Sequence, residues 1–125
     1  MKLRSLYLIH SLVVFIYALG LLLIPPTILQ LYGFGVSPGE KLLAQFFGVQ
    51  LLTAGLVTLL ARDVTETTAR NAINISIVIS YAIGLIISIG GTLSNTMNAL
   101  GWSAVVIYAA FAIAFAFFQF FVVEE

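Results

Sequence analysis

Six polar side chains lie within long apolar runs of this 125-residue chain and are its candidates for chemistry. They are Tyr17, Gln50, Tyr81, Tyr108, His10 and Asn74. Their hydroxyl, imidazole and carboxamide groups donate and accept hydrogen bonds, and His and Tyr can also exchange protons. The sequence adds no Ser-His-Asp set, Glu-x-x-His pair, phosphate-cradling glycine loop or paired carboxylates. These residues therefore favour hydrogen bonding or ligand binding over catalysis, and we predict no catalytic residue.

The chain has one histidine and no cysteine, which restricts metal and redox chemistry. Without cysteine there are no disulfides, thiolate metal ligands or thiol nucleophiles. His10 alone lacks the companions that a metal site needs, unless other subunits supply copies of it. We expect no metal site and no cofactor, and we expect His10 to be a neutral, hydrogen-bonded packing residue.

The composition indicates an integral membrane protein. Apolar residues make up 62% of the chain and charged residues 8%, whereas soluble domains have about half and about a quarter. A chain this small cannot hide so much apolar surface from water, so lipid must be its main partner. Its five basic residues are scattered and its net charge is zero, which argues against nucleic-acid binding.

Four apolar runs are long enough to cross the roughly 30 Å of bilayer hydrocarbon. They cover about 3–24, 38–61, 70–90 and 100–123, within a single transmembrane domain of 1–125. Pro25-Pro26 ends the first run, and residues 26–32 read as a short interfacial helix that stops at Gly33. The predicted fold is all-α: an antiparallel four-helix transmembrane bundle with a short interfacial helix in the first outer loop.

Local signals mark the ends of two spans. Ser37-Pro38-Gly39-Glu40 fits a capping box with proline at the first helical position. Glu66 and Arg70 have the i,i+4 spacing of a helical ion pair. Because the link at 62–65 is short, we expect the second and third spans to be packed as antiparallel neighbours.

The basic residues predict the orientation in the membrane. Lys2, Arg4, Arg62 and Arg70 fall on one side and Lys41 on the other. Since cytoplasmic loops carry the excess of Lys and Arg, both termini should be cytoplasmic. The same orientation predicts interfacial aromatic residues, with Tyr32 and Trp102 outside and Tyr7 inside.

Small residues predict where helices touch, because they let backbones approach closely in lipid. Gly48 and Gly55 belong to such a stripe on the second span, together with Thr58. On the third span Ser76, Ser80 and Gly84 recur every four residues, and a second face carries the seam Asn71, Asn74, Val78, Tyr81 and Leu85. Two contact faces indicate a central helix or one at a subunit boundary.

Each span places one polar group near the membrane midplane. With a rise of about 1.5 Å per residue, Gln50 and Tyr81 fall at the centre, and Tyr17 and Tyr108 within roughly 5 Å of it. These groups could form a closed hydrogen-bonded cluster, a pocket for a lipid, quinone or small amphiphile, or a water-filled pore. Gln50 lies about 120° from the small stripe, so it could face another subunit and favour self-association.

Three segments carry a family resemblance. The run from Ile24 to Gly33, the run Phe46-Phe47-Gly48-Val49-Gln50 through Leu56, and Ala61-Arg62-Asp63 look like the DoxX-like small four-helix membrane proteins of bacteria and archaea. The resemblance implies a prokaryotic cell membrane and a role as an accessory subunit of a membrane redox system, such as quinone-linked sulfur oxidation. Apart from Glu40 in the capping box, the spans here contain no cysteine and no acidic residue, so the sequence offers little support for redox chemistry by this chain alone.

Three classes of function remain open. The favoured one is a non-enzymatic membrane subunit or scaffold that associates with itself or another membrane subunit and holds a lipid or quinone-like amphiphile. A small oligomeric channel or transporter is the first alternative, and it would need a continuous polar path. An integral-membrane enzyme acting on an apolar substrate is the second, and only His10 and the tyrosines could provide its reactive groups.

Overall fold

The computed structural model describes residues 1–121 and contains five helices in that range. They are α1 (Leu3–Leu23), α2 (Pro25–Leu31), α3 (Pro38–Leu60), α4 (Thr67–Leu93) and α5 (Gly101–Phe120). Helices α1, α3, α4 and α5 are long and apolar enough to span a membrane, and the short α2 lies between α1 and α3. The predicted fold class is therefore confirmed. Residues 122 and 123 of the last predicted span lie outside the described residues.

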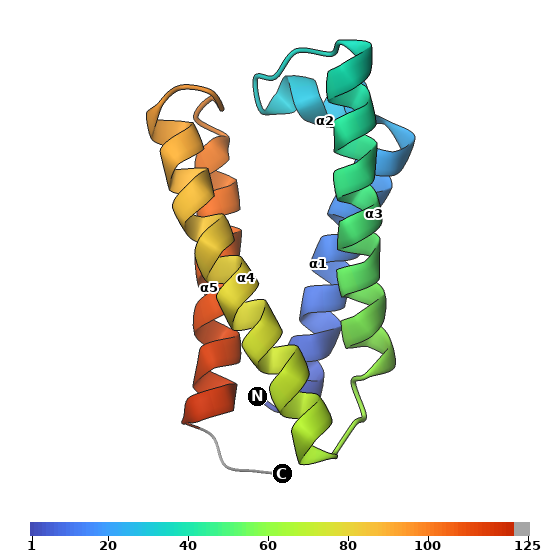
Figure 1. Cartoon of the computed structure of the whole chain (residues 1–125), viewed down its shortest axis with the longest axis vertical. Helices are drawn as coiled ribbons and strands as arrows, with labels where there is room; N and C mark the ends of the chain where they lie inside the picture. Colours follow the sequence, from blue (N-terminus) through green and yellow to red (C-terminus); the bar gives the residue numbers. More distant parts are fainter. Residues whose placement is uncertain (122–125) are drawn as a thin grey trace.

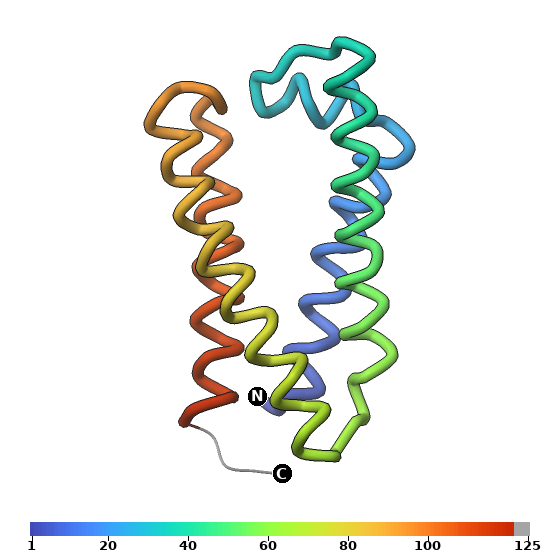
Figure 2. The backbone as a smooth tube through the Cα atoms, in the orientation of Figure 1, coloured from blue at the N-terminus to red at the C-terminus, as the bar shows by residue number. Residues whose placement is uncertain are grey.

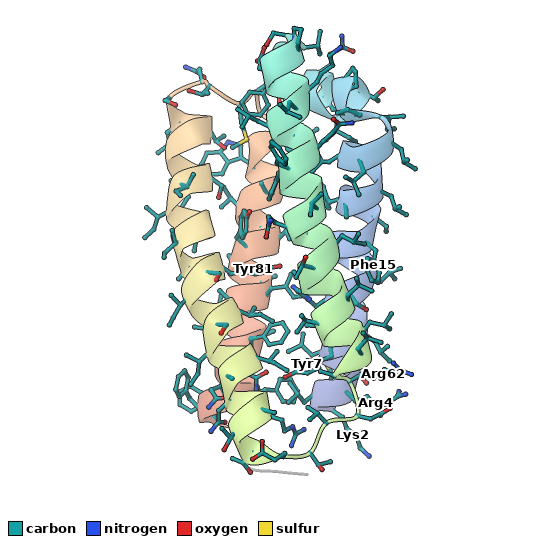
Figure 3. All side chains as sticks on the ribbon, turned by 45° about the vertical axis from the view of Figure 1, so that its right-hand side comes forward. Lys2, Arg4, Tyr7, Phe15, Arg62 and Tyr81 are labelled. Carbon is teal, nitrogen blue, oxygen red and sulfur yellow. The ribbon has the colours of Figure 1, made fainter. Side chains whose placement is uncertain are left out.

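The long helices form two antiparallel pairs, α1 with α3 and α4 with α5 (Figures 1 and 2). The pairs approach each other at the end that carries the N-terminus and separate towards the end covered by α2 (Figure 1). We call these the basic end, which carries Lys2, Arg4, Arg62 and Arg70, and the α2 end. Figure 3 shows the first three of these cations together at the basic end.

The expectation that α3 and α4 pack as neighbours is wrong. Helix α3 packs along α1 instead, because Gly48 and Gly55 leave room there: an added Cβ at Gly55 would lie 2.8 Å from the Phe15 ring. Helix α4 packs along α5, where a Cβ at Gly84 would lie 2.6 Å from the Tyr108 ring. Glycine at close contacts, rather than the length of the connecting link, thus decides which helices pair.

The helix starts follow their side-chain caps. At α3 the predicted capping box is confirmed: Ser37 Oγ accepts from the Glu40 amide, and the Glu40 carboxylate accepts from the Ser37 amide. At α4 the predicted Glu66–Arg70 pairing is replaced by capping, since the Glu66 carboxylate accepts from the Thr68 and Ala69 amides at 2.9 and 2.8 Å. Satisfying orphan amides at a helix start outweighs an exposed ion pair.

The main apolar core lies in the half of the bundle nearer the basic end. It consists of Leu3, Leu6, Tyr7, Phe111 and Phe115. Tyr7, which was predicted at the membrane interface, is fully buried in the bundle and packs on Phe115 with ring centroids 5.8 Å apart. This core joins α1 to α4 and α5 and holds the two helix pairs together.

Candidate functional site

A chain of side-chain hydrogen bonds crosses the bundle near the basic end. The Tyr7 hydroxyl donates to Asn74 Oδ1 at 2.7 Å, and Asn74 Nδ2 donates to Gln119 Oε1 at 3.2 Å. Gln119 Nε2 then donates to Asn71 Oδ1 at 3.0 Å. The chain links α1, α4 and α5 and satisfies amide groups that would otherwise be costly in an apolar medium.

His10 forms a second connection, closer to the middle of the bundle. It is fully buried, with Nδ1 2.9 Å from Thr58 Oγ1 on α3 and Nε2 2.6 Å from the Tyr81 hydroxyl on α4. Thr58 uses its own proton for the carbonyls of Ala54 and Gly55. This geometry favours the tautomer in which His10 Nδ1–H donates to Thr58 and Nε2 accepts from Tyr81. The imidazole thus joins both helix pairs, and its partner on α4, Tyr81, is labelled in Figure 3.

A cavity of about 550 Å³ lies between the helix pairs, from the level of Tyr81 to the α2 end. Its walls are mostly apolar and come from all five helices. Lining residues include Val14, Leu21, Ala44, Leu51 and Ile107. This volume and lining are typical of sites for small apolar molecules.

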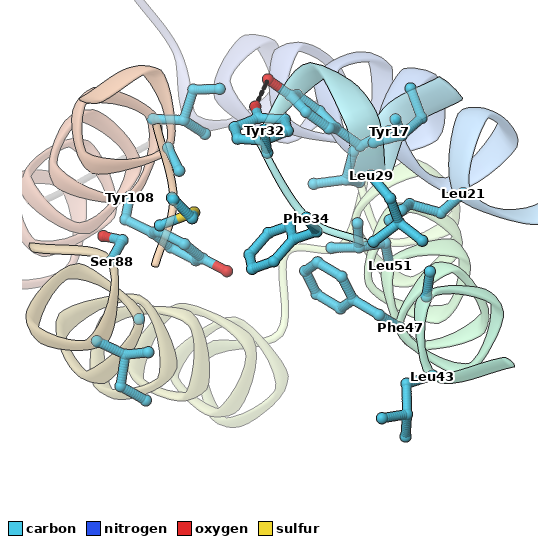
Figure 4. A pocket seen from close by; sticks show the side chains of 18 of the residues that line it. Tyr17, Leu21, Leu29, Tyr32, Phe34, Leu43, Phe47, Leu51, Ser88 and Tyr108 are labelled. Carbon is cyan, nitrogen blue, oxygen red and sulfur yellow. Dashed lines mark hydrogen bonds between the residues drawn. The ribbon is translucent and has the colours of Figure 1, made fainter. Parts of the chain in front are cut away.

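Helix α2 and the residues after it form the roof of the cavity, through Ile28, Leu29, Tyr32 and Phe34. The Tyr17 and Tyr32 hydroxyls are 3.1 Å apart (Figure 4), and Tyr32 is 3.2 Å from Ser103 Oγ. Ser103 donates its proton to the Leu100 carbonyl, so Tyr32 donates to Ser103 and Tyr17 donates to Tyr32. These bonds connect the roof to both helix pairs.

The loop between α4 and α5 strengthens this closure. Asn98 Nδ2 donates to the Leu31 carbonyl at 3.0 Å, and its backbone amide donates to the Tyr32 carbonyl at 3.0 Å. The turn after α2 is possible because Gly33 adopts φ 87°, a conformation that suits glycine. The roof is thus held by backbone and side-chain bonds rather than by apolar contact alone.

The side of the cavity between α3 and α4 is open. Leu43, Phe47 and Ile87 line the cavity and are nevertheless 69%, 47% and 68% exposed. In Figure 4 no helix closes the space between Leu43 and α4. The opening thus lies between two helices that are long and apolar enough to span a membrane.

Tyr108 places its hydroxyl inside the cavity. The group points away from α5 towards Phe34 (Figure 4), and it forms no hydrogen bond with any of residues 1–121. The Tyr108 ring stands edge-on to Tyr81, with centroids 5.2 Å apart and an interplanar angle of 89°. Gly84 provides the space for that ring.

The structure brings together three of the four predicted midplane residues, since Tyr17, Tyr81 and Tyr108 all line the cavity. His10 lies beside them through its bond to Tyr81. Asn74 belongs to the separate chain nearer the basic end. Gln50 is exposed on the outside of α3 and does not line the cavity.

The predicted packing residues divide in a similar way. Gly48, Gly55 and Gly84 each lie at a close helix contact. Ser76 and Ser80 are exposed, and Ser76 Oγ bonds only to the Ala72 carbonyl of its own helix, at 2.6 Å, within the part of the chain described. Helix α4 therefore meets its neighbours through Gly84 and the seam that contains Asn74 and Tyr81.

Sequence reasoning missed several residues of these clusters. Thr58 was assigned only to a packing stripe, and Tyr7 and Tyr32 only to the interfaces. Phe34 and Phe47 line the cavity without any polar or periodic signal to single them out. The i,i+3 spacing of Tyr7 and His10 was a usable signal, because it places both side chains on one face of α1.

Two ion pairs meet at Asp63 at the basic end, and the one with Arg4 is closer than the one with Arg62, in which Nε lies 3.8 Å from Asp63 Oδ2. Arg4 Nε is 2.6 Å from Asp63 Oδ1, which ties α1 to the link between α3 and α4. The Arg4 hydrogen bond holds the pKa of the Asp63 carboxyl below its ordinary value. Both side chains are more than half exposed, so the pair adds little to stability.

Comparisons of the chain with protein-family models, curated proteins and solved structures give no match. The fold and the site on their own define the class: a small polytopic membrane protein with a cavity that opens sideways between two spans.

Proposed function

We propose that the protein is a non-enzymatic membrane subunit or scaffold that holds a lipid or quinone-like amphiphile in the cavity between its helix pairs. The observation that carries this proposal is the combination of an apolar cavity, a hydrogen-bonded roof and a side opening between α3 and α4. A hydrophobic molecule could enter from the bilayer without crossing water. Its transfer costs little because the cavity and the hydrocarbon are both apolar.

The hydrogen-bond pattern favours a protein that holds a ligand over a channel. The cavity ends at the layer of His10, Tyr81 and Phe111, where the His10 and Phe111 ring centroids are 5.0 Å apart. A channel would need polar groups along its whole length. The polar side chains near the basic end instead bond to one another across the helix contacts.

Cavity binding is tested by narrowing the side opening with a matched control. Ile87 lines the cavity and Ile86 does not, although the two are 68% and 70% exposed. We expect native mass spectrometry of wild-type protein from a mild detergent to detect a bound amphiphile, and Ile87→Trp to lose most of it. Ile86→Trp should retain it. Equal retention in both variants, or no retention by wild type, would contradict the proposal.

We further propose self-association through the outer face of α3. Gln50 is exposed in the central part of α3, and an unpaired carboxamide in hydrocarbon is costly. A second copy could supply its partner, since carboxamides bond well across membrane helices. The DoxX-like resemblance remains a proposal that agrees with a subunit role.

The cytoplasmic location of both termini is also a proposal. It is supported by the four cations at the basic end, where α1 begins and α5 ends. A reporter that works only in the cytoplasm should be active when it is fused after Glu125, and a reporter that works only in the periplasm should be inactive there. Activity of a periplasmic reporter at that position would overturn the orientation.

A further inference from the structure

Tyr108 differs from the other hydroxyl groups of the cavity because its proton is unused. Tyr81 donates to His10, and Tyr17 donates to Tyr32. Tyr32 donates to Ser103, and Ser88 donates to the Leu85 carbonyl at 3.0 Å. Within residues 1–121, Tyr108 is the one lining hydroxyl without a bond. A donor facing an apolar cavity gains most from an acceptor on a bound molecule.

The position of Tyr108 is fixed by its surroundings. Its ring packs edge-on against Tyr81, which His10 holds in turn, and it lies over Gly84 of α4. A side chain at Gly84 would come within 2.6 Å of Tyr108 Cε1, so glycine is needed for the ring to lie there. The hydroxyl is thus preoriented, which lowers the entropy cost of binding.

Charge complementarity narrows the class of ligand. The charged residue among the described lining side chains is Glu40, at the α2 end, and its carboxylate already accepts from the Ser37 amide. The described lining contains no cation that could balance a phosphate or carboxylate headgroup. Burying an unpaired charge in these walls would be costly. The bound molecule should therefore be uncharged where it meets Tyr108.

We infer that Tyr108 is the polar anchor for a neutral carbonyl-bearing amphiphile, such as a ketone, quinone or ester, that enters between α3 and α4. A carbonyl oxygen accepts the free proton of Tyr108 and brings no second donor into the apolar walls. The apolar part of the molecule then contacts residues such as Leu51 and Ile107. This inference rests on the proposed function, because it assumes that the cavity holds an amphiphile.

The test compares 2-tridecanone with tridecane, which has the same chain length but no acceptor. Binding is measured by titration calorimetry in dodecyl maltoside, a detergent without carbonyl groups. One hydrogen bond predicts that wild type binds the ketone about five-fold more tightly than the alkane. Infrared spectroscopy should show the ketone C=O band at lower wavenumber with protein than in empty micelles.

Tyr108→Phe should abolish both the affinity difference and the band shift while leaving tridecane binding unchanged. Tyr7→Phe is the control for the loss of a tyrosine hydroxyl, because Tyr7 lies outside the cavity and bonds to Asn74, so this variant should keep the preference for the ketone. Gly84→Ala should act like Tyr108→Phe by displacing the ring, whereas Gly90→Ala should not, since nothing lies near an added Cβ there.

The outcomes separate this inference from the proposed function. If wild type binds ketone and alkane equally with no band shift, the anchor is wrong but the cavity still holds amphiphiles. Retention of the ketone preference in Tyr108→Phe would overturn the anchor in the same way. If wild type binds neither probe, the proposed function and this inference both fail.

Discussion

The Tyr81 hydroxyl lies 2.6 Å from His10 Nε2, and this bond joins the two helix pairs at the floor of the cavity. On the other side of the imidazole, Nδ1 is 2.9 Å from Thr58 Oγ1. Because Thr58 Oγ1 also lies within donating distance of two carbonyls of its own helix, we predict that the histidine carries its proton on Nδ1. Because Tyr81 donates its proton to His10, its hydroxyl cannot also donate to a ligand in the cavity.

The tautomer of His10 is a direct prediction. The chain has a single histidine, so after removal of any affinity tag one pair of ring ¹⁵N signals is expected. Nδ1 should appear protonated and Nε2 unprotonated near neutral pH. Tyr81→Phe should shift the Nε2 signal through loss of its hydrogen bond and leave Nδ1–H in place. A protonated Nε2 in wild type would contradict the donor order.

Glycine at the α1–α3 contact should be essential for stability. At Gly55 an added Cβ would lie 2.9 Å from the Val14 side chain and 2.8 Å from the Phe15 ring, whereas at Gly90 nothing lies within 4 Å. We expect Gly55→Ala to lower the free energy of unfolding by about 1–3 kcal/mol through overpacking. Gly90→Ala should be neutral or stabilising, because alanine favours helix. Equilibrium unfolding in mixed micelles measures the free energy of unfolding of both variants. Equal changes in the two would contradict a close α1–α3 contact at Gly55.

The Arg4–Asp63 pair predicts a local dependence on pH. The folded-state pKa of Asp63 lies below its ordinary value of 3.8, mainly through the Arg4 hydrogen bond. The contribution of the pair is therefore complete above about pH 4 and is lost as the pH falls through the lowered pKa. Carboxyl ¹³C titration should show the Asp63 pKa rising in Arg4→Gln.

Glu66 provides the control for that titration. Its pKa is also lowered, but by the Thr68 and Ala69 amides, so Arg4→Gln should leave it unchanged. A common shift of both carboxyls would indicate a general electrostatic effect rather than the specific pair. An unchanged pKa of Asp63 in Arg4→Gln would contradict the role of the Arg4–Asp63 pair.

Self-association through α3 should depend on Gln50. Replacing this exposed carboxamide by Leu should reduce the oligomeric fraction seen by native mass measurement in mild detergents. Gln45→Leu is the matched control on the same helix, because the Gln45 amide already donates to the Leu22 carbonyl at 3.4 Å. A strict monomer for wild type in several detergents would count against the proposed interface.

The sequence predicted the architecture well for identifiable reasons. Runs of about 20 apolar residues can satisfy their backbone groups in lipid only as helices, and the Ser37–Glu40 capping box marks one helix start. The pairing of helices was harder to predict. It depends on which glycine meets which side chain, as at Gly84 and Tyr108, and a short link at 62–65 does not decide it.

The candidate site was predicted in part. Depth along each span brought Tyr17, Tyr81 and Tyr108 to one level, and all three line the cavity. Depth does not give helix rotation, so Gln50 was placed with them although its side chain faces outward. The hydrogen bonds that hold the roof were not predicted, because the Tyr32–Ser103 and Asn98–Leu31 bonds join segments far apart in the sequence.

Methyl NMR of methionine tests the central claim, that the cavity holds an amphiphile, most directly. The chain has two methionines: Met97 lines the cavity, and Met1 is 76% exposed at the opposite end. With ¹³C-labelled methionine methyl groups in deuterated detergent, added 2-tridecanone should give intermolecular NOEs to Met97 and not to Met1, and Ile87→Trp should weaken them. Equal NOEs to both methyls, or none to Met97 at saturating ketone, would contradict the account.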